Sequence, residues 1–392
     1  MKRTILRLCT FFIAVILCIG YCVLSINAKE NSDLEQADTS LVGEAKSVIL
    51  IEAETGKILY EYEADIRLAP ASVTKIMTIL LVAEELDKGT IKLTDTIQVS
   101  DNASHMGGSQ VYLKAGEEMS VEDLLKSVII ASANDAATVL AEHISGSVEG
   151  FVERMNKRAS ELGMTNTVFE NPTGLDDSTV DHKTTARDIS LMSRELMKHK
   201  LILNYTTIWM DTIRNGEFGL TNTNRLIRFY SGANGLKTGS TSKAGFCISA
   251  AAKRDGMQLI AVIMGAPNRD IRNEIAKKLL DYGFANYKYL NYEAAEGEPV
   301  KVLGGVSNSC KLICEKFDIV LDKSQAAKGV EKVINLPESL SAPIKTGEVV
   351  GSIDYKVGGE VIGSSRIFAA ENVEKISYGG LIKRIFEKFF FN

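Results

Sequence analysis

The spacing of apolar residues changes several times along the chain, and these changes predict the order of its helices and strands. Short apolar runs at 47–51 and 57–60 flank Thr55-Gly56, which predicts a β-hairpin. From Ser72 the apolar residues recur at helical spacing and stop at Gly89. Further helices are predicted where the same spacing returns, from Ser120, from Asp135 to about 144, over 151–162 and over 186–198.

After Gly235 the pattern becomes that of strands. Apolar runs at 244–253 and 258–265 are joined by Arg254-Asp255-Gly256, a turn sequence, and predict adjacent strands of an antiparallel sheet; a helix is predicted over 271–287. We therefore predict an α+β domain over residues 43–287, with an antiparallel sheet flanked by helices. Short alternating strands with turn glycines predict a small all-β domain over residues 291–375.

The two ends of the chain have patterns of their own. Basic residues precede an apolar run at 8–24, and Ser25-Ile26-Asn27-Ala28 after it ends in a small residue, which predicts a secretory signal peptide over residues 1–28. The apolar run approaches the length of a membrane span, so an uncleaved anchor is the alternative. Residues 29–42 are polar and aperiodic and predict a flexible lead-in.

At the C-terminus, residues 376–392 alternate apolar and charged positions at helical spacing. The apolar positions are Leu381, Ile382, Ile385, Phe386, Phe389 and Phe390, and the polar ones are Lys383, Arg384, Glu387 and Lys388. The segment predicts an amphipathic helix that attaches the secreted protein to the outer face of the cytoplasmic membrane, with an anionic membrane surface as partner. The alternative is a terminal helix packed on its own β domain.

Composition excludes several classes of function. The 392 residues are 45% apolar and 24% charged with a net charge of −5, so the basic field that a nucleic-acid partner needs is missing. The four histidines and the cysteines lack metal-ligand spacing, and the sequence has neither a Walker loop nor a dinucleotide-binding glycine run. No metal and no cofactor are expected. His182 is expected to cap a helix at the surface.

Candidate chemistry begins at Ser72-Val73-Thr74-Lys75. Residues three apart on a helix share one face, so the Ser72 hydroxyl and the Lys75 amine are expected to meet. A serine hydroxyl needs a base to become a nucleophile. A lysine serves as that base only when it is neutral, a state that burial and a neighbouring cation favour. Lys237 is a candidate for that cation.

Two further short motifs accompany Ser72-Val73-Thr74-Lys75. Ser132-Ala133-Asn134 lies between predicted helices, where a loop can aim a hydroxyl and an amide into a cleft, although Asn134 alone is typical of a helix cap. Lys237-Thr238-Gly239 opens a strand, where glycine allows a substrate backbone to approach closely. Three such motifs in this order indicate a serine acyl-transfer enzyme.

Other short motifs accompany these three: Ala69-Pro70-Ala71-Ser72, Gly108-Ser109-Gln110, Leu162-Gly163-Met164, Asn171-Pro172-Thr173-Gly174-Leu175 and Lys237-Thr238-Gly239-Ser240-Thr241 with Ala244-Gly245. The whole set resembles serine-type D-alanyl-D-alanine carboxypeptidases, the low-molecular-weight penicillin-binding proteins of bacterial cell walls. The resemblance is strong over residues 43–287 and implies a β-lactamase/transpeptidase-like fold for that domain.

The resemblance also implies roles for individual residues. The catalytic residues would be Ser72 as nucleophile, Lys75 as base and Ser132 as proton relay. The substrate-binding residues would be Asn134, Lys237, Thr238, Ser240, Thr241 and Arg272. Relatives often carry a tyrosine or histidine at position 240, so the serine here leaves one wall of the cleft less bulky. The implied substrate is the peptidoglycan stem pentapeptide, and β-lactams are the implied covalent inhibitors.

Two other functions compete with this interpretation. A β-lactamase on the same scaffold would carry a Glu-x-x-x-Asn loop, and the tract Phe169-Glu170-Asn171-Pro172 lacks that spacing. A β-lactam sensor would be acylated at the same serine without releasing product. The release of D-alanine from a pentapeptide mimic distinguishes the sensor from a carboxypeptidase.

Overall fold

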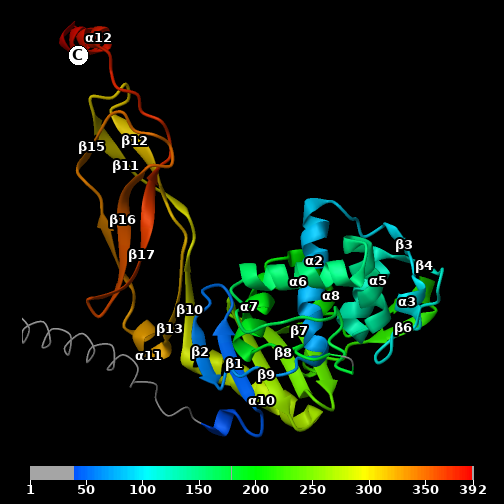
Figure 1. The fold of residues 1–392 in the computed structure, drawn as a ribbon. Coiled ribbons are helices and arrows are strands. Elements are labelled where there is room, and N and C mark those ends of the chain that lie inside the picture. Colours follow the sequence, from blue (N-terminus) through cyan, green and yellow to red (C-terminus); the bar gives the residue numbers. More distant parts are fainter. Residues whose placement is uncertain (1–38, 178, 391–392) are drawn as a thin grey trace, which may run out of the picture.

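A computed structural model describes residues 39–390 of the chain, except residue 178. The predicted signal peptide and most of the predicted lead-in lie outside the described residues. A 3₁₀ turn, η1 (Thr39–Leu41), opens the described part, and Val42 after it is buried. Figure 1 shows two bodies joined in sequence, a broad domain of helices and sheet and a slender all-β domain.

A five-stranded antiparallel sheet forms the centre of the first domain. Its order is β2-β1-β9-β8-β7, which confirms both the predicted hairpin and the predicted adjacent strands. The bounds are β1 (Ser47–Glu52), β2 (Ile58–Tyr62), β7 (Ala233–Thr241), β8 (Gly245–Arg254) and β9 (Met257–Ala266). β7 is the last strand on one side, and none of the described strands pairs with its outer edge.

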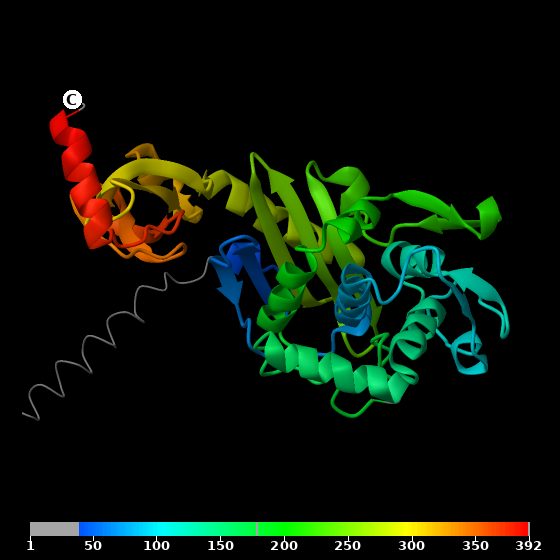
Figure 2. The same cartoon turned by 90° about the horizontal axis from the view of Figure 1, so that it is seen from above.

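Both faces of this sheet are buried, and alternate residues of each strand feed two separate cores. On β9, Leu259 and Ala261 pack with α10 (Arg269–Asn286), whereas Ile260 and Val262 pack with the helices of the other face. Figure 2 shows those helices gathered on one side of the sheet. They are α2 (Lys75–Lys88), α3 (Asp101–Ser104), α4 (Val121–Lys126), α5 (Asn134–Ser145), α6 (Val148–Glu161), α7 (Ala186–Leu196) and α8 (Lys200–Thr206). The short helix α9 (Leu226–Phe229) belongs to the face of α10, since Leu226 is part of that core.

Several helix ends have the sequence signals that predicted them. The Ser120 hydroxyl accepts a hydrogen bond from the Asp123 N–H at 3.1 Å and caps α4. Gly89 ends α2 in the left-handed region, with φ of 71°, where glycine is favoured. The sequence pattern does not predict two short antiparallel pairs of strands. One pair is β3 (Thr96–Gln98) with β4 (Glu118–Ser120). The other is β5 (Met210–Ile213) with β6 (Phe218–Thr221), which are connected by η4 (Arg214–Gly216).

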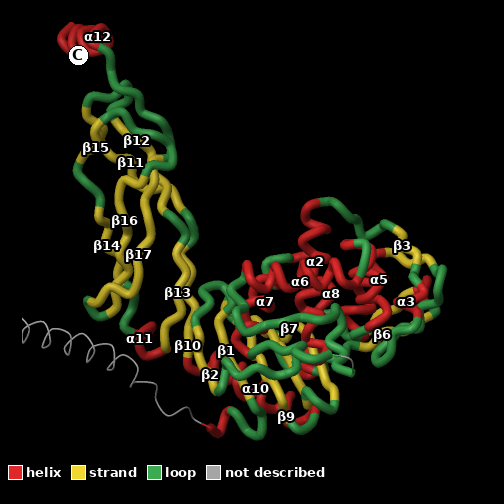
Figure 3. The backbone as a smooth tube through the Cα atoms, in the orientation of Figure 1, coloured by secondary structure: helices red, strands yellow, loops and turns green. Residues whose placement is uncertain are grey.

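The second domain is built from strands, as Figure 3 shows. A six-stranded sheet has the order β14-β16-β17-β12-β11-β15, and β10 pairs with β13 beside it. The bounds are β10 (Tyr287–Tyr292), β11 (Ala295–Leu303), β12 (Ser309–Cys314), β13 (Phe317–Asp322), α11 (Lys323–Ala327), β14 (Glu331–Asn335), β15 (Ser339–Ser341), β16 (Val349–Val357) and β17 (Glu360–Ala369). Cys310 and Cys314 share β12 and, like Cys247, are free thiols.

The last element is α12 (Tyr378–Phe390), which lies at the tip of the β domain farthest from the first domain (Figure 1). Its apolar residues are exposed, from 44% at Leu381 to 82% at Phe389, so the helix does not bury this face against the β domain. Among the described residues, no helix combines the length and apolar character that crossing a membrane requires.

Candidate active site

Ser72 and Lys75 meet where a 3₁₀ turn, η2 (Ala71–Thr74), runs directly into α2. Ser72 is half-buried, and Lys75 is the fully buried first residue of α2. The Lys75 Nζ lies 2.9 Å from the Ser72 Oγ. The spacing of three residues therefore brings the two groups together, as the sequence predicts. Ala71, just before Ser72, has a φ of 49°, an uncommon conformation for a residue with a side chain.

The Lys75 amine has three hydrogen-bond partners within the site. Its Nζ donates to the Asn134 Oδ1 at 2.6 Å and to the Thr173 carbonyl at 2.8 Å, and both of these atoms can only accept. A neutral amine has two N–H groups and one lone pair. A charged amine donates its third N–H to the Ser72 Oγ at 2.9 Å, whereas a neutral amine turns its lone pair to that oxygen and can accept the Ser72 proton.

The electrostatic surroundings decide between these two forms. Burial lowers the pKa of Lys75 well below its usual value, and the positive charge of Lys237 lowers it further, whereas the negative charge of Asp135 opposes the shift. The Asp135 carboxylate is itself held by the backbone N–H groups of Val111 and Leu113, each at 3.1 Å. The site therefore favours the form of Lys75 that can accept a proton.

Ser132 and Asn134 come from the turn between two helices. A π-helical turn, η3 (Ser127–Ala131), ends at Ser132 in the left-handed region, with φ of 65°, and α5 begins at Asn134. The Asn134 amide bridges the site, because its Oδ1 accepts from Lys75 while its Nδ2 donates to the Gly107 carbonyl at 2.7 Å. The Ser132 Oγ is buried and has no hydrogen-bond partner among the described residues, which leaves it free to carry a proton.

Strand β7 carries the third motif, Lys237-Thr238-Gly239, and lies against Ser72. A Cβ atom on Gly239 would lie only 2.7 Å from the Ser72 backbone nitrogen, so a residue with a side chain would push the strand away from η2. Lys237 is buried, with its Nζ 3.1 Å from the Thr238 carbonyl. Burial, together with the positive charge of Arg272, lowers the pKa of Lys237 to about 7.

The remaining predicted residues fall in different places. Ser240 is exposed, whereas the Thr241 hydroxyl donates to the Asp176 carboxylate and accepts from the Ala244 N–H at 3.0 Å. Arg272 is buried, and its guanidinium donates to the Asn273 Oδ1 at 2.8 Å and to the Cys247 carbonyl at 3.3 Å. Burial lowers the pKa of Arg272 to about 10.

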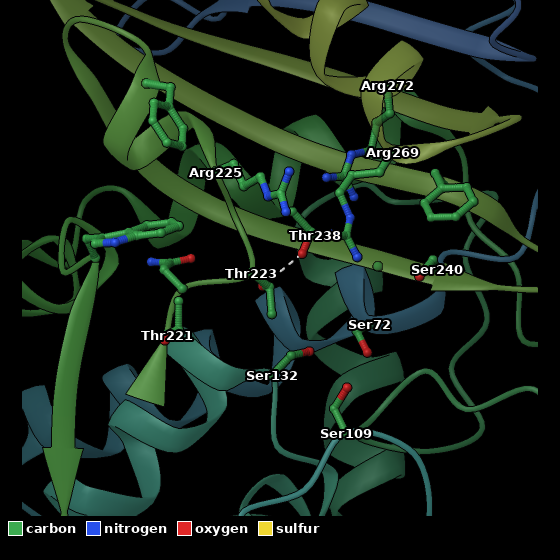
Figure 4. Close-up of a pocket in the computed structure, with 15 residues that line it drawn as sticks. Ser72, Ser109, Ser132, Thr221, Thr223, Arg225, Thr238, Ser240, Arg269 and Arg272 are labelled. Atoms are coloured by element: carbon green, nitrogen blue, oxygen red, sulfur yellow. Dashed lines mark hydrogen bonds between the residues drawn. The ribbon is translucent and has the colours of Figure 1, made fainter. Parts of the chain in front are cut away.

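A cavity of about 680 Å³ opens over these groups (Figure 4). In Figure 4 the hydroxyls of Ser72, Ser109 and Ser132 point toward one another across it. Its described lining residues are Ser72, Ser109, Ser132, Trp209, Thr221, Asn222, Thr223, Arg225, Phe229, Thr238, Gly239, Ser240, Phe246, Arg269 and Arg272. In the described part of the chain, no group of three or more His, Cys, Asp or Glu side chains is arranged to hold a metal ion.

The loop that presents the Thr173 carbonyl to Lys75 is a part of the site that spacing alone does not assign. The Asn171 Oδ1 accepts from the N–H groups of Gly174 at 2.7 Å and Thr173 at 3.1 Å, which folds the loop tightly. Asn171-Pro172-Thr173-Gly174-Leu175 was visible as a motif, but its hydrogen bond to Lys75 depends on the fold. A Cβ on Gly174 would overlap the Ala71 carbonyl, so this loop packs directly on η2.

His182 corrects one expectation. It is 3% exposed rather than at the surface, with Nε2 2.8 Å from the Thr74 Oγ1 and Nδ1 accepting from the Glu170 N–H at 2.9 Å. Burial lowers its pKa to about 4, so the ring is neutral at ordinary pH. His182 therefore links the loop to η2 from inside.

Comparisons with known proteins agree over most of the chain. The family model for D-alanyl-D-alanine carboxypeptidase matches residues 34–268, and that for the C-terminal domain of penicillin-binding protein 5 matches residues 291–375. D-alanyl-D-alanine carboxypeptidase DacF of Bacillus subtilis (strain 168) is 43% identical over 352 residues, which cover 88% of this chain and 90% of the relative.

Two solved structures are similar as well. Penicillin-binding protein 5 from Haemophilus influenzae is 33% identical with a TM-score of 0.74, over 85% of this chain and 98% of that one. Penicillin-binding protein D2 from Listeria monocytogenes, solved in its ampicillin-bound form, is 31% identical with a TM-score of 0.57, over 62% of this chain and 98% of that one. The chain belongs to the D-alanyl-D-alanine carboxypeptidases of peptidase family S11, which are serine hydrolases.

Proposed function

We propose that Ser72, activated by Lys75, carries out the carboxypeptidase reaction as two successive acyl transfers. The observation that supports this assignment best is the distance of 2.9 Å between the Lys75 Nζ and the Ser72 Oγ, in an amine whose two other partners can only accept. Burial and the charge of Lys237 lower the pKa of Lys75 and favour its neutral form. A base of this kind is what a serine nucleophile requires.

In the first step the Ser72 Oγ bonds to the carbonyl carbon between the two D-alanines of a peptidoglycan stem pentapeptide, and its proton passes to the Lys75 Nζ. The backbone N–H groups of Ser72 and Ser240 receive the oxyanion. The C–N bond then breaks, and the proton held by Lys75 passes through the Ser132 hydroxyl, which is otherwise unpartnered among the described residues, to the departing amine. In the second step water attacks the acyl carbon, and the tetrapeptide leaves.

The substrate lies as an added strand along the outer edge of β7, which none of the described strands occupies. Lys237, Thr238 and Arg272 are the groups assigned to its terminal carboxylate. This places the leaving D-alanine toward Thr238 and the acyl portion toward Ser240. Asn134 holds the substrate amide. Because its hydroxyl is bonded to Asp176, Thr241 contributes through its backbone.

We infer that β-lactams acylate the same serine, since the relative from Listeria monocytogenes was solved with ampicillin bound. The geometry gives less support to a β-lactamase. Glu170 is the glutamate of the tract compared with the water-activating loop of β-lactamases. Its carboxylate accepts from the N–H groups of Val180 and Asp181 at 2.9 and 2.6 Å, and it is not among the cavity's described lining residues.

One experiment separates the three candidate activities. The purified chain is incubated with benzylpenicillin and analysed by mass spectrometry, while D-alanine release is measured from diacetyl-L-Lys-D-Ala-D-Ala. A carboxypeptidase forms a penicilloyl adduct and releases D-alanine. An adduct without any release would identify a sensor, and rapid hydrolysis of penicillin without a lasting adduct would identify a β-lactamase.

We also propose that residues 1–28 direct secretion, that residues 43–287 and 291–375 are the two domains, and that residues 376–392 attach the protein to the outer face of the membrane. The exposed apolar face of α12 supports the attachment, because six of its residues are between 44% and 82% exposed. Lys383 on the same helix is 78% exposed and suits an anionic lipid surface.

A further inference from the structure

The cavity extends well past the position proposed for the terminal D-alanine. Beyond Thr238 its wall continues through Thr223, whose Oγ1 lies 2.9 Å from the Thr238 Oγ1. The wall then reaches Arg225 and the aromatic residues Trp209 and Phe229. Figure 4 shows Arg225 directed toward Thr238, on the side of the cavity away from Ser240. A leaving alanine, with its single methyl side chain, would leave this end of the cavity unfilled.

The charge of this region is one-sided. Arg225 is exposed, and no acidic side chain of the described residues pairs with it. None of the described residues that line the cavity is acidic, whereas Arg225, Arg269 and Arg272 all line it. Lys237 and Arg272 already supply the cations assigned to the terminal carboxylate. Arg225 is thus a further cation with no assigned partner.

Aromatic side chains form the wall beside Arg225. Trp209 and Phe229 meet edge to face, with their ring centroids 6.2 Å apart, and Phe229 is 63% exposed. An exposed phenylalanine at the mouth of a cavity offers a surface on which the aliphatic part of a ligand side chain can pack. The combination of a free guanidinium and an aromatic wall suits a side chain that has a methylene stem and an anionic end.

We propose that this end of the cavity is a second anion subsite for a leaving D-residue that is larger than alanine and carries a carboxylate in its side chain. The proposal rests on the proposed function and names a further class of substrate for it. The terminal carboxylate of such a residue would occupy the place of the D-alanine carboxylate, and the side-chain carboxylate would pair with Arg225. The enzyme would then cut the peptide link between D-alanine and an acidic D-amino acid.

The chemistry is unchanged apart from the leaving group. The Ser72 Oγ bonds to the D-alanine carbonyl carbon, and the bond from that carbon to the nitrogen of the acidic residue breaks. The nitrogen takes up a proton and leaves as the amine of the free amino acid. Water then supplies a hydroxyl to the acyl carbon and a proton to Ser72.

The test compares three peptides on the full chain, diacetyl-L-Lys-D-Ala followed by D-Ala, D-Glu or D-Gln. D-Glu and D-Gln have nearly the same shape and differ in charge, so the ratio of their kcat/KM values isolates the anionic group. We expect the wild-type protein to favour D-Glu over D-Gln by roughly fivefold, the size that a partly exposed ion pair provides. Arg225→Gln is expected to bring that ratio to about 1, and Arg225→Lys to keep part of it.

Arg228→Gln is the matched control. Arg228 lies on α9, three residues after Arg225, stacks over the Trp209 ring at 5.6 Å and is not among the described residues that line the cavity. The control is expected to keep the D-Glu preference. A ratio near 1 in the wild type, an unaltered ratio in Arg225→Gln, or an equal loss of kcat/KM on all three peptides in that variant would overturn the subsite. Absence of D-alanine release from the first peptide would instead overturn the proposed function.

Discussion

Lys75 and Lys237 are two fully buried lysines, and their positive charges repel each other. The charge of Lys237 lowers the pKa of Lys75, and burial with the nearby Arg272 lowers the pKa of Lys237 to about 7. Each lysine needs a different protonation state for its proposed role, because Lys75 must be neutral to accept a proton and Lys237 must be charged to attract a carboxylate. A pH dependence follows directly from this pair.

The pH profile of kcat/KM is predicted to be bell-shaped. Activity rises with pH as Lys75 loses its proton, and falls above about pH 7 as Lys237 loses its charge. In Lys237→Gln the rising limb moves to higher pH, because removal of the neighbouring positive charge raises the pKa of Lys75. The falling limb disappears in that variant, and kcat/KM at the optimum drops by at least about tenfold.

Arg269→Gln is the control for this profile, because Arg269 is an exposed cation that lines the same cavity. Solvent screens its charge, so its removal should move the rising limb less than Lys237→Gln does. Equal shifts in the two variants, or no shift in Lys237→Gln, would show that Lys237 does not set the basicity of Lys75.

The sequence could predict that two residues of the site are neighbours where their separation along a helix fixes the distance between them. The separation of three between Ser72 and Lys75 sufficed, because one turn of helix fixes their distance. The acceptor role of the Thr173 carbonyl and the burial of His182 could not be predicted, since both depend on how the loop containing them folds back onto η2. A backbone carbonyl is present at every residue, so the residue type does not indicate that the Thr173 carbonyl accepts a hydrogen bond from Lys75.

At the scale of elements, the approach of β7 to η2 brings Gly239 against Ser72, the proposed nucleophile. Gly239 allows this contact, because a Cβ there would lie 2.7 Å from the nitrogen of Ser72, 2.9 Å from that of Val73 and 2.9 Å from the Pro70 carbonyl oxygen. All three are backbone atoms, so no side chain can rotate to make room. The strand or the turn would have to move.

Gly239→Ala is therefore predicted to destabilise the protein by about 1–3 kcal/mol and to slow acylation of Ser72 more than tenfold, because the oxyanion site opens. The measurements are the free energy of unfolding in urea and the rate of labelling by a fluorescent penicillin. Gly219→Ala on β6 is the control, since a Cβ at Gly219 meets no atom within 4 Å. If the two variants acylate at the same rate, the close approach of β7 is not needed for catalysis.

Among elements, long regular ones were predictable and short irregular ones were not. The apolar runs of β8 and β9 and the stripe of α2 span at least two turns or several strand positions, and the structure confirms them. The sequence pattern predicts ordinary helix or loop where the structure has the 3₁₀ turn η2 and the π-helical turn η3. Their conformations follow from tertiary contacts rather than from periodicity.

At the scale of the whole molecule, α12 lies at the tip of the β domain farthest from the first domain, which contains the candidate active site (Figure 1). The Arg384 guanidinium donates to the Gly305 carbonyl at 3.1 Å and to the Asn308 Oδ1 at 2.8 Å, so the helix is joined to the β domain while its apolar face stays exposed. In the proposed attachment, a membrane bound to α12 would thus hold the first domain away from the lipid.

Removal of residues 376–392 from the chain that begins at residue 29 should abolish co-sedimentation with phosphatidylglycerol vesicles and leave D-alanine release from a small peptide intact. Phe386→Glu with Phe389→Glu should weaken vesicle binding at least about tenfold, since each buried phenylalanine contributes about 2 kcal/mol. Lys57→Glu, far from α12, serves as a charge control. Sedimentation of the truncated chain at the level of the full one would show that another segment anchors the protein.

The central claim, that Ser72 is the acylated nucleophile, is tested most directly by peptide mapping of the penicilloyl adduct in wild type and in Ser72→Ala. We predict one adduct in the wild type, on the peptide that contains Ser72, and neither an adduct nor D-alanine release in the variant. Full labelling of Ser72→Ala, or an adduct mapped to Ser240, would contradict the account.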